Sequence, residues 1–262
     1  MTWNPGQYAR FADHRERPFH DLVARIGAEA PALVFDVGCG PGTATATLAG
    51  RWPGAGVMGY DSSEAMVDAA QPLTTERLHF ELADAHELEV GRADVLISNA
   101  MLQWLPDHRE LVRAWADALR PGAWMAFQVP GNFDAPSHAL MRALAESPRW
   151  APQLAGVLRG GETVDTPVGY AELLLEAGWS VDAWETTYIQ WLSGEDPVLE
   201  WVRGTGLRPV LNALNEADTA EFEAEYASML RAAYPSRRGP DGQQLTALPF
   251  RRIFVVGNKP QA

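Results

Sequence analysis

The segment Asp36-Val37-Gly38-Cys39-Gly40-Pro41-Gly42 has the residue types and spacing of a ligand-binding turn. It follows a short apolar run at 33–37 and precedes a helix-like run at 43–51. Glycines at a strand-to-helix turn permit a tight bend and let the backbone approach a ligand closely. On its own, such a turn could also be an ordinary connection between a strand and a helix.

Asp36 indicates which ligand the turn would accept. A glycine turn followed by an acidic residue also describes NAD sites, where the turn holds a pyrophosphate. A carboxylate two residues before the first glycine would repel a pyrophosphate, but it would attract an ammonium group. The amino group of a methionine moiety supplies such a charge, so the segment disfavours a dinucleotide.

Asp61 ends the next predicted strand, at 56–60, about 20 residues after the turn. A carboxylate at that point can accept hydrogen bonds from both hydroxyls of an adenosine ribose. Asp61 could instead only cap the following helix, although Ser62 and Ser63 also offer that role.

Two further loops follow predicted strands. Asp84 and Ala85 come after the strand at 78–82, where a side chain and a backbone N–H can meet the edge of an adenine ring. A plain loop aspartate is the alternative for Asp84. The loop from Asn99 follows the strand at 93–98, at the carboxyl edge of the sheet where open α/β folds bind ligands.

The elements that must position these loops alternate between strand and helix. A leading amphipathic helix is expected at 14–28. The alternation that follows implies right-handed crossovers and a mostly parallel sheet. The expected strands lie at 33–37, 56–60, 78–82, 93–98, 123–129, 181–192 and 248–256.

The regular alternation loosens beyond Pro130, where prolines and glycines surround a predicted helix at 138–146. No repeat or flexible linker marks a domain boundary. We therefore expect one domain over 1–262 with insertions at about 131–166 and 195–235. These insertions are largely helical and are expected to form a lid.

The composition limits the partners of the chain. A formal charge of −13 and a pI of about 4.9 repel nucleic-acid phosphates and anionic lipid headgroups. The single cysteine, Cys39, excludes an intrachain disulfide and a multi-thiolate metal site. No apolar run approaches the roughly 20 residues of a membrane span, and the first residues lack a signal-peptide pattern. We expect a cytoplasmic protein with no nucleic-acid or membrane partner; its oligomeric state stays open.

The segments Asp36 to Gly42, Asp61-Ser62-Ser63 and Asp84-Ala85 resemble the cofactor motifs of class I S-adenosylmethionine-dependent methyltransferases. The resemblance implies a Rossmann-like α/β fold with a seven-stranded, mostly parallel sheet whose last strand is antiparallel. It also implies S-adenosyl-L-methionine as the cofactor. The residues expected to bind this cofactor are Arg15, Asp36, Gly38, Gly40, Gly42, Asp61, Ser62, Met66, Asp84, Ala85 and Asn99.

Segments outside the cofactor motifs carry a narrower resemblance. They are Trp3-Asn4-Pro5, Arg15-Glu16-Arg17-Pro18, the run 98–108, Trp184-Glu185-Thr186-Thr187-Tyr188 and Thr205-Gly206-Leu207-Arg208-Pro209. Together they resemble the trans-aconitate 2-methyltransferase family. The resemblance implies methyl transfer to a carboxylate of trans-aconitate, which gives a monomethyl ester and S-adenosylhomocysteine.

Such a reaction needs neither a general base nor a metal. A carboxylate with a pKa near 4 is already ionised at neutral pH, so its oxygen can attack a sulfonium methyl directly. Acceleration would come from aligning oxygen, carbon and sulfur and from removing water, with orientation contributing about 7 to 11 kcal/mol at best. We therefore expect no catalytic residue and no metal ligand.

A polycarboxylate that enters an acidic protein must find local positive charge, and arginine forks bind carboxylates through two hydrogen bonds. Any one of these arginines could instead be a surface salt-bridge partner, and the amide and aromatic side chains could be turn or core residues. The substrate-binding candidates are Gln103, Trp104, Gln128, Asn132, Arg159, Tyr188, Arg203 and Arg208.

Two other functions fit parts of the sequence. The cofactor motifs also suit a methyltransferase of the same fold that acts on another small carboxylic acid or on a hydroxylated natural product. An arginine-lined pocket would discriminate between these substrates. A non-catalytic S-adenosylmethionine-binding module, which holds a partner protein through some of its ten tryptophans, is the third hypothesis.

Overall fold

The centre of the protein is a mixed sheet. The computed structural model of the chain describes residues 12–158 and 164–261, with side chains from residue 16 onward. Within these residues the strands are β1 Leu33–Val37, β2 Gly56–Asp61, β3 Leu78–Leu82, β4 Val95–Asn99, β5 Trp124–Pro130, β6 Ser180–Ser193, β7 Arg237–Arg238 and β8 Gln244–Asn258.

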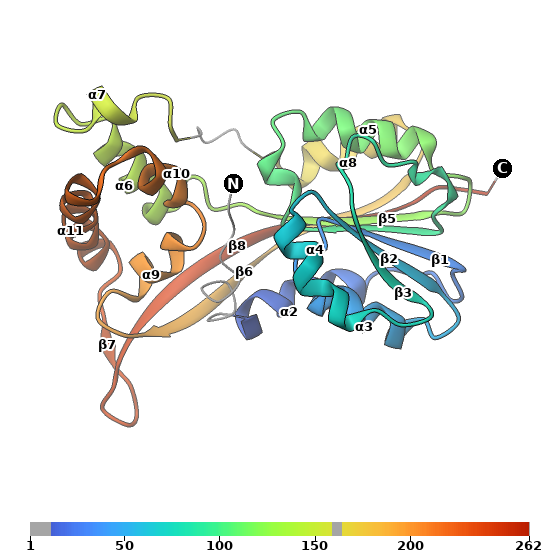
Figure 1. Cartoon of the computed structure of the whole chain (residues 1–262), viewed down its shortest axis with the longest axis horizontal. Helices are drawn as coiled ribbons and strands as arrows, with labels where there is room; N and C mark the ends of the chain where they lie inside the picture. The colour runs from blue at the N-terminus through green and yellow to red at the C-terminus, as the bar shows by residue number, and fades with distance from the viewer. Residues whose placement is uncertain (1–11, 159–163, 262) are drawn as a thin grey trace.

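Seven of these strands follow the order β3-β2-β1-β4-β5-β8-β6 (Figure 1). Strands β1 to β5 are parallel, and β8 lies antiparallel between β5 and β6. The predicted α/β fold with a mostly parallel seven-stranded sheet is confirmed. The two-residue β7, which pairs with the start of β8, is an addition that the sequence analysis did not predict.

Helices complete the crossovers between the parallel strands, because parallel neighbours cannot be joined by a short hairpin. The helices of the described residues are α2 Ala12–Val23, α3 Thr43–Arg51, α4 Glu64–Ala70, α5 His108–Ala118, α6 Pro136–Ala145, α7 Ala151–Leu154, α8 Pro167–Glu176, α9 Pro197–Arg203, α10 Arg208–Ala213 and α11 Glu216–Ala233, with short 3₁₀ turns η1 Gln71–Leu73, η2 Val90–Arg92 and η3 Leu102–Trp104.

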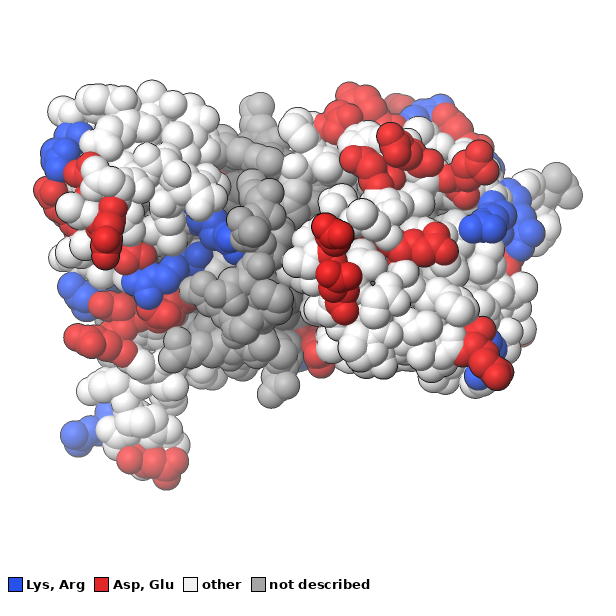
Figure 2. Space-filling model, in the orientation of Figure 1, with Lys and Arg blue, Asp and Glu red and all other residues white. Residues whose placement is uncertain are grey.

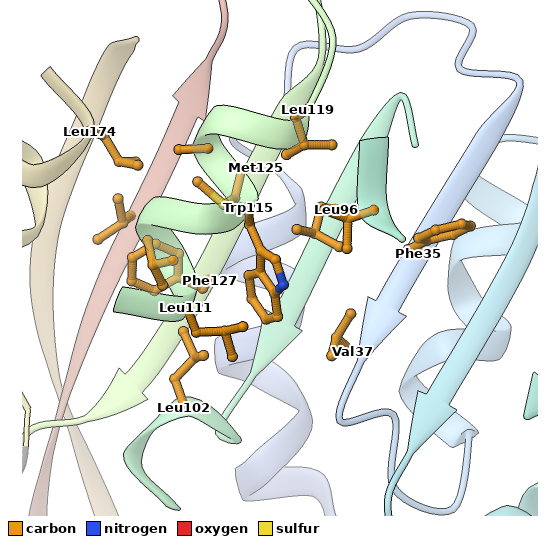
Figure 3. Packing of buried hydrophobic residues seen from close by; sticks show 14 of the residues in the cluster. Phe35, Val37, Leu96, Leu102, Leu111, Trp115, Leu119, Met125, Phe127 and Leu174 are labelled. Carbon is orange, nitrogen blue, oxygen red and sulfur yellow. The ribbon is translucent and has the colours of Figure 1, made fainter. Parts of the chain in front are cut away.

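The sheet is covered on both faces. Helices α5 and α8 contribute Leu111, Trp115 and Leu174 to the core on one face, together with β-strand residues such as Phe127 (Figure 3). Helices α2, α3 and α4 contribute Leu22 and other apolar side chains to the core on the opposite face. Burial on both faces explains the near-continuous apolar runs in β4 and β5.

The remaining helices form a separate layer. We call α6, α7, α9, α10 and α11 the helical layer; it lies beside the extended ends of β6 and β8, on the left of Figure 1. Its core includes Trp150 and Phe222, whose ring centroids are 5.4 Å apart, and Leu192 and Leu248 from the two strands. The helical layer thus has an apolar core of its own.

The leading helix differs from its predicted bounds. It ends at Val23 and not at residue 28, because the bonds that follow are of the shorter i to i+3 type, from the N–H of Arg25 to Leu22 O at 3.1 Å and from the N–H of Ile26 to Val23 O at 3.1 Å. Ile26 is nevertheless buried, as the apolar spacing predicts.

The surface is divided by charge. On the face shown in Figure 2, acidic side chains predominate over the part that carries α4 and α5, whereas Lys and Arg side chains alternate with acids over the helical layer. Among the helices that the structure describes, none combines the length and apolarity needed to cross a membrane.

The buried position of Phe222 yields a stability prediction. Replacing Phe222 by Ala removes the fully buried ring that packs against Trp150, and such a truncation costs about 3 to 5 kcal/mol. We expect the free energy of unfolding in urea to fall by that amount. The control Leu175→Ala, at a side chain that is 58% exposed, should change it by less than about 0.5 kcal/mol. Equal losses in the two variants would contradict the packing role of the ring.

Candidate functional site

The glycine turn after β1 is bent by Gly38, Gly40 and Gly42, whose φ angles of 81°, 56° and 79° lie in the left-handed region. The N–H of Gly38 donates to Tyr60 O at 2.8 Å, which holds the turn against the end of β2. A Cβ on Gly42 would lie 2.7 Å from the Phe80 ring, whereas a Cβ on Gly40 would meet nothing within 4 Å. The turn therefore faces open space at Gly40, where a ligand could approach the backbone.

Asp36 lies beneath this turn with an incompletely bonded carboxyl group. Its Oδ2 accepts a 2.6 Å hydrogen bond from Thr45 Oγ1, while Oδ1 has no hydrogen-bond partner among the described residues. Burial raises the pKa of Asp36 to about 7, although the Thr45 hydrogen bond lowers it. An ammonium group beside Oδ1 would supply a partner and favour the ionised form. Asp36 therefore fits the amino group of the predicted cofactor.

Asp61 joins the glycine turn to the start of α4. Its Oδ2 accepts from the N–H of Gly40 at 2.9 Å, and its Oδ1 accepts from the N–H of Ser63 at 2.9 Å. Each carboxylate oxygen keeps capacity for a second donor, as a ribose hydroxyl would require. Ser63 stands at the N-cap position but makes no side-chain cap, so the expected serine cap is wrong and Asp61 orders this backbone instead. Of the nearby candidates, Ser62 is exposed and Met66 is buried.

Asp84 is held by a histidine. Its Oδ1 accepts from the N–H of His86 at 2.9 Å and lies 2.8 Å from His86 Nδ1, while His86 Nε2 lies 3.0 Å from Asp107 Oδ2. The hydrogen bonds from His86 lower the pKa of Asp84. Asp84 is exposed and Ala85 is half-buried. This arrangement connects the loop after β3, which carries the predicted adenine contacts, to the loop after β4.

A chain of polar side chains runs along the neighbouring strand ends. The Gln128 amide lies 2.8 Å from Asn99 Oδ1 and 3.3 Å from Arg252 Nη1. Asn99 ends β4 and pairs in register with Gln128 of β5, and Arg252 follows on β8. The predicted cofactor residue Asn99 and the predicted substrate residue Gln128 are thus brought together with an arginine that was not predicted.

A cavity of about 310 Å³ opens beside the loop that follows β4. The sheet side contributes residues of β5, β8 and η3, and the opposite wall comes from the helical layer. The predicted residues Gln103 and Trp104 both line it. The described lining residues are Ala100, Gln103, Trp104, Pro130, Phe133, His138, Met141, Arg142, Val157, Leu158, Trp201, Thr205, Gly206, Pro209, Phe250 and Arg252.

The backbone at the cavity mouth is strained. Ala100 has a φ of 55°, which a residue with a Cβ rarely adopts. Its N–H donates to Gln128 O at 2.9 Å, and its carbonyl accepts from Gln103 Nε2 at 2.6 Å. These two bonds hold the loop after β4 against β5.

Arginines line the cavity, as expected, but they are not the predicted ones. Arg252 is buried, with its guanidinium carbon 4.7 Å from the centre of the Phe250 ring, and Arg142 lies on α6 with Nη2 3.8 Å from Asp134 Oδ1. Arg252 shares its strand face with Phe250 and Phe254, because alternate residues of a strand point the same way. That inward position in an apolar strand is the signal that could have identified it.

The predicted arginines lie elsewhere. Arg203 forms a bidentate ion pair with Glu223, at 2.8 and 2.9 Å, and a further ion pair with Glu200. Its guanidinium is therefore directed at α11 and not at the cavity. Arg208 is half-buried at the start of α10 and is not among the described lining residues, although Thr205, Gly206 and Pro209 around it are. Arg159 and the side chain of Arg15 lie outside the described residues.

Asn132 and Tyr188, two of the predicted substrate-binding residues, have structural partners. Asn132 is buried and clamps β5 to β8, since its Nδ2 donates to Arg251 O at 2.8 Å and its Oδ1 accepts from the N–H of Arg251 at 2.7 Å. Tyr188 packs in the core under α2, where its hydroxyl donates to Asp21 Oδ2 at 2.7 Å. Both lie outside the described lining of the cavity.

The chain is similar to known methyltransferases. Residues 11–184 match the family model described as a methyltransferase domain. The chain is 49% identical to a trans-aconitate 2-methyltransferase of Streptomyces avermitilis, over 98% of this chain and 97% of the relative. It is 52% identical to a trans-aconitate 2-methyltransferase of Mycolicibacterium gilvum, over 97% of this chain and 98% of the relative.

Solved structures share the fold at low sequence identity. The YcgJ protein from Bacillus subtilis is similar with a TM-score of 0.61 at 15% identity, over 94% of this chain and 99% of that chain. A Haemonchus contortus phosphoethanolamine N-methyltransferase 2, solved in complex with S-adenosyl-L-methionine, is similar with a TM-score of 0.53 at 16% identity, over 94% of this chain and 53% of that chain. These similarities concern the fold.

The carboxyl group of Asp36 yields a prediction about ligand affinity. Asp36→Asn keeps an acceptor for Thr45 but removes the charge that would face an ammonium group. Since a hydrogen bond to a charged group contributes about 1.5 to 3 kcal/mol, S-adenosylhomocysteine should bind at least about tenfold more weakly in calorimetry. The exposed control Asp68→Asn should bind it normally.

The same carboxyl group makes this affinity depend on pH. Because the ligand prefers ionised Asp36, whose pKa is about 7, affinity should increase as pH rises from about 6 to about 8 and then level off. Asp36→Asn should show no such increase. An identical pH profile in the variant would show that another group titrates.

Proposed function

We propose that this chain, which belongs to the methyltransferase family and within it to the trans-aconitate 2-methyltransferases, transfers a methyl group from S-adenosyl-L-methionine to a carboxylate of trans-aconitate. The products are the monomethyl ester and S-adenosylhomocysteine. The observation that carries this proposal for the chain's own residues is the cavity with two arginines beside the strand ends that hold the predicted cofactor residues.

Charge favours a polycarboxylate in this cavity. The protein has a formal charge of −13, so an anion is repelled by the molecule as a whole. Arg142 and Arg252 line the cavity, and none of its described lining residues is acidic. A guanidinium offers carboxylates a planar fork of donors, which gives orientation as well as attraction.

The polar chain at the strand ends supports a positioning role for Arg252. Its Nη1 lies 3.3 Å from the Gln128 amide, which in turn lies 2.8 Å from Asn99 Oδ1. A carboxylate bound to Arg252 would therefore lie close to Asn99, which is predicted to bind the cofactor. Positioning of this kind lowers the entropic part of the barrier.

The surroundings of the cavity suit an attack that needs no base. When bound, S-adenosyl-L-methionine supplies an electrophilic methyl group on a sulfonium. A carboxylate is ionised at neutral pH, so its oxygen carries the required electron pair without losing a proton first. The rings of Trp104, Phe133, Trp201 and Phe250 line the cavity and limit water, which strengthens the pull of the arginines on the anion.

We extend the proposal to the setting of the reaction. The single cysteine suits a reducing compartment, which supports a cytoplasmic location. The acidic surface argues against a nucleic acid as the partner, whereas the two cavity arginines favour a small anion. We also keep the proposal of one domain over 1–262, with the helical layer inserted to cover the cavity.

The substrate proposal is tested by an acid panel. Incubating the protein with S-adenosyl-L-methionine and trans-aconitate should give a product heavier by one methylene group in mass spectrometry. Mono- and dicarboxylic acids of similar size should react more slowly, because they engage fewer of the cavity's cations. Preferential methylation of another acid or of a hydroxylated compound would overturn the proposed substrate.

The two cavity arginines give a matched set of variants. Arg252→Gln and Arg142→Gln should each raise the KM for trans-aconitate by about tenfold to a hundredfold, since each removes a charged hydrogen-bond donor. The dissociation constant of S-adenosylhomocysteine should change little. The control Arg113→Gln changes a partly exposed side chain of α5 beside Asp117 and should leave both constants unchanged. Arg252→Lys, which keeps the charge, should raise the KM less than Arg252→Gln does. A KM unaffected in both Gln variants would overturn the role of the two arginines in substrate binding.

A further inference from the structure

The cavity contains a third ionisable side chain besides its two arginines. Among the described lining residues, the ionisable groups are Arg142, Arg252 and His138. His138 lies on α6, one turn before Arg142. It plays no part in the carboxylate contacts proposed above, so its presence in the lining calls for a separate explanation.

The immediate surroundings of His138 keep the ring neutral. Its Nδ1 lies 3.1 Å from Ser137 Oγ, and its ring centroid is 5.9 Å from that of Phe133. On the side of α9 and α10 it faces Gly206, where a Cβ would lie 3.1 Å from Nε2. Burial, together with the charge of Arg142, lowers the pKa of His138 to about 4.

Other charged and titratable groups near His138 come from the neighbouring elements. Asp134 precedes α6 and has Oδ1 3.8 Å from Arg142 Nη2. Tyr226 and Tyr234, at α11, bind the backbone of Ser137 at 2.6 and 3.0 Å. Arg252 lines the same cavity from β8. None of the described residues that line the cavity therefore offers a carboxylate to His138.

A substrate carboxylate would change that balance. Trans-aconitate carries three carboxylates, which are ionised at neutral pH, whereas the two arginines supply two positive charges. Histidine is the side chain that can add a charge near neutral pH, and a carboxylate beside it favours the charged ring. A carboxylate of the substrate beside His138 would therefore favour the charged ring.

We propose, on the basis of the proposed function, that His138 takes up a proton when the tricarboxylate binds and releases it when the ester leaves. The transfer itself exchanges no proton: the carboxylate oxygen takes the methyl group, and the electron pair of the broken carbon–sulfur bond stays on sulfur. The transfer neutralises one carboxylate and the sulfonium together, so the total charge of the two ligands does not change. The proton returns to solvent when the ester dissociates, because the neutral ring is then restored.

Calorimetry measures this proton directly. Trans-aconitate is titrated into protein saturated with S-adenosylhomocysteine, at about pH 7, in buffers of different ionisation enthalpy. Saturation with S-adenosylhomocysteine keeps the titration of Asp36 out of the measurement. We expect an uptake approaching about one proton per site, and less than half of that for the monomethyl ester.

Affinity for trans-aconitate should also depend on pH. Because the complex binds the proton and the free protein does not, the dissociation constant should increase by up to about tenfold per pH unit between the pKa of the free His138, about 4, and that of the bound ring, and level off above it. His138→Gln should bind more weakly, without proton uptake and without this slope. The matched control His79→Gln, at an exposed position on β3, should retain both.

The outcomes separate this proposal from the function on which it rests. Binding of trans-aconitate without proton exchange, or exchange that persists in His138→Gln, would overturn the role of His138 and leave the substrate intact. Absence of binding to the unsubstituted protein would overturn the proposed substrate, and this role with it. Where His138→Gln does not fold, absence of the pH slope in the unsubstituted protein would still overturn the role of His138.

Discussion

The cavity depends on the interactions that hold the buried guanidinium of Arg252. A charge removed from water is costly unless hydrogen bonds and polarisable neighbours compensate for it. Here the compensation comes from the Gln128 amide and from the face of the Phe250 ring. Because Gln128 also lies against Asn99, the same amide fixes how the cavity is placed relative to the ends of the parallel strands. Binding a carboxylate would therefore complete an arrangement that the fold already holds in place.

Local sequence patterns predicted the parallel strands and the glycine turn well, since both depend on neighbouring residues. Asp36 and Asp61 lie at the carboxyl ends of β1 and β2, so their position at that edge could be inferred from the order of the elements. The cavity arginines could not be inferred in this way. Arg142 and Arg252 come from α6 and β8, which are far apart in the chain, and the spacing between them carries no information. Arg203 was predicted as one of several arginines that could bind a carboxylate, but its guanidinium is bound by Glu223, a partner twenty residues away.

The cavity lies between two parts of the protein with separate apolar cores. Arg252 and Gln103 come from the sheet side, and His138 and Arg142 come from the helical layer. The helical layer is tied together at α6 by two hydrogen bonds: Tyr226 donates to Ser137 O, and the N–H of Ser137 donates to the Tyr234 hydroxyl. An anion that contacts both parts would add a link between two cores that otherwise meet along β6 and β8. Substrate contacts and the packing of the helical layer are therefore coupled.

The left-handed backbone at Ala100 has a consequence for the entropy of binding. A left-handed conformation costs a residue with a Cβ about 1 to 2 kcal/mol, and glycine would avoid that cost. Alanine, however, has fewer alternative conformations than glycine, so less freedom is left for a ligand to remove. The bonds to Gln128 and Gln103 hold the one conformation that remains. The strain at Ala100 is therefore a property of the fold itself, and the loop after β4 is ordered before a ligand binds.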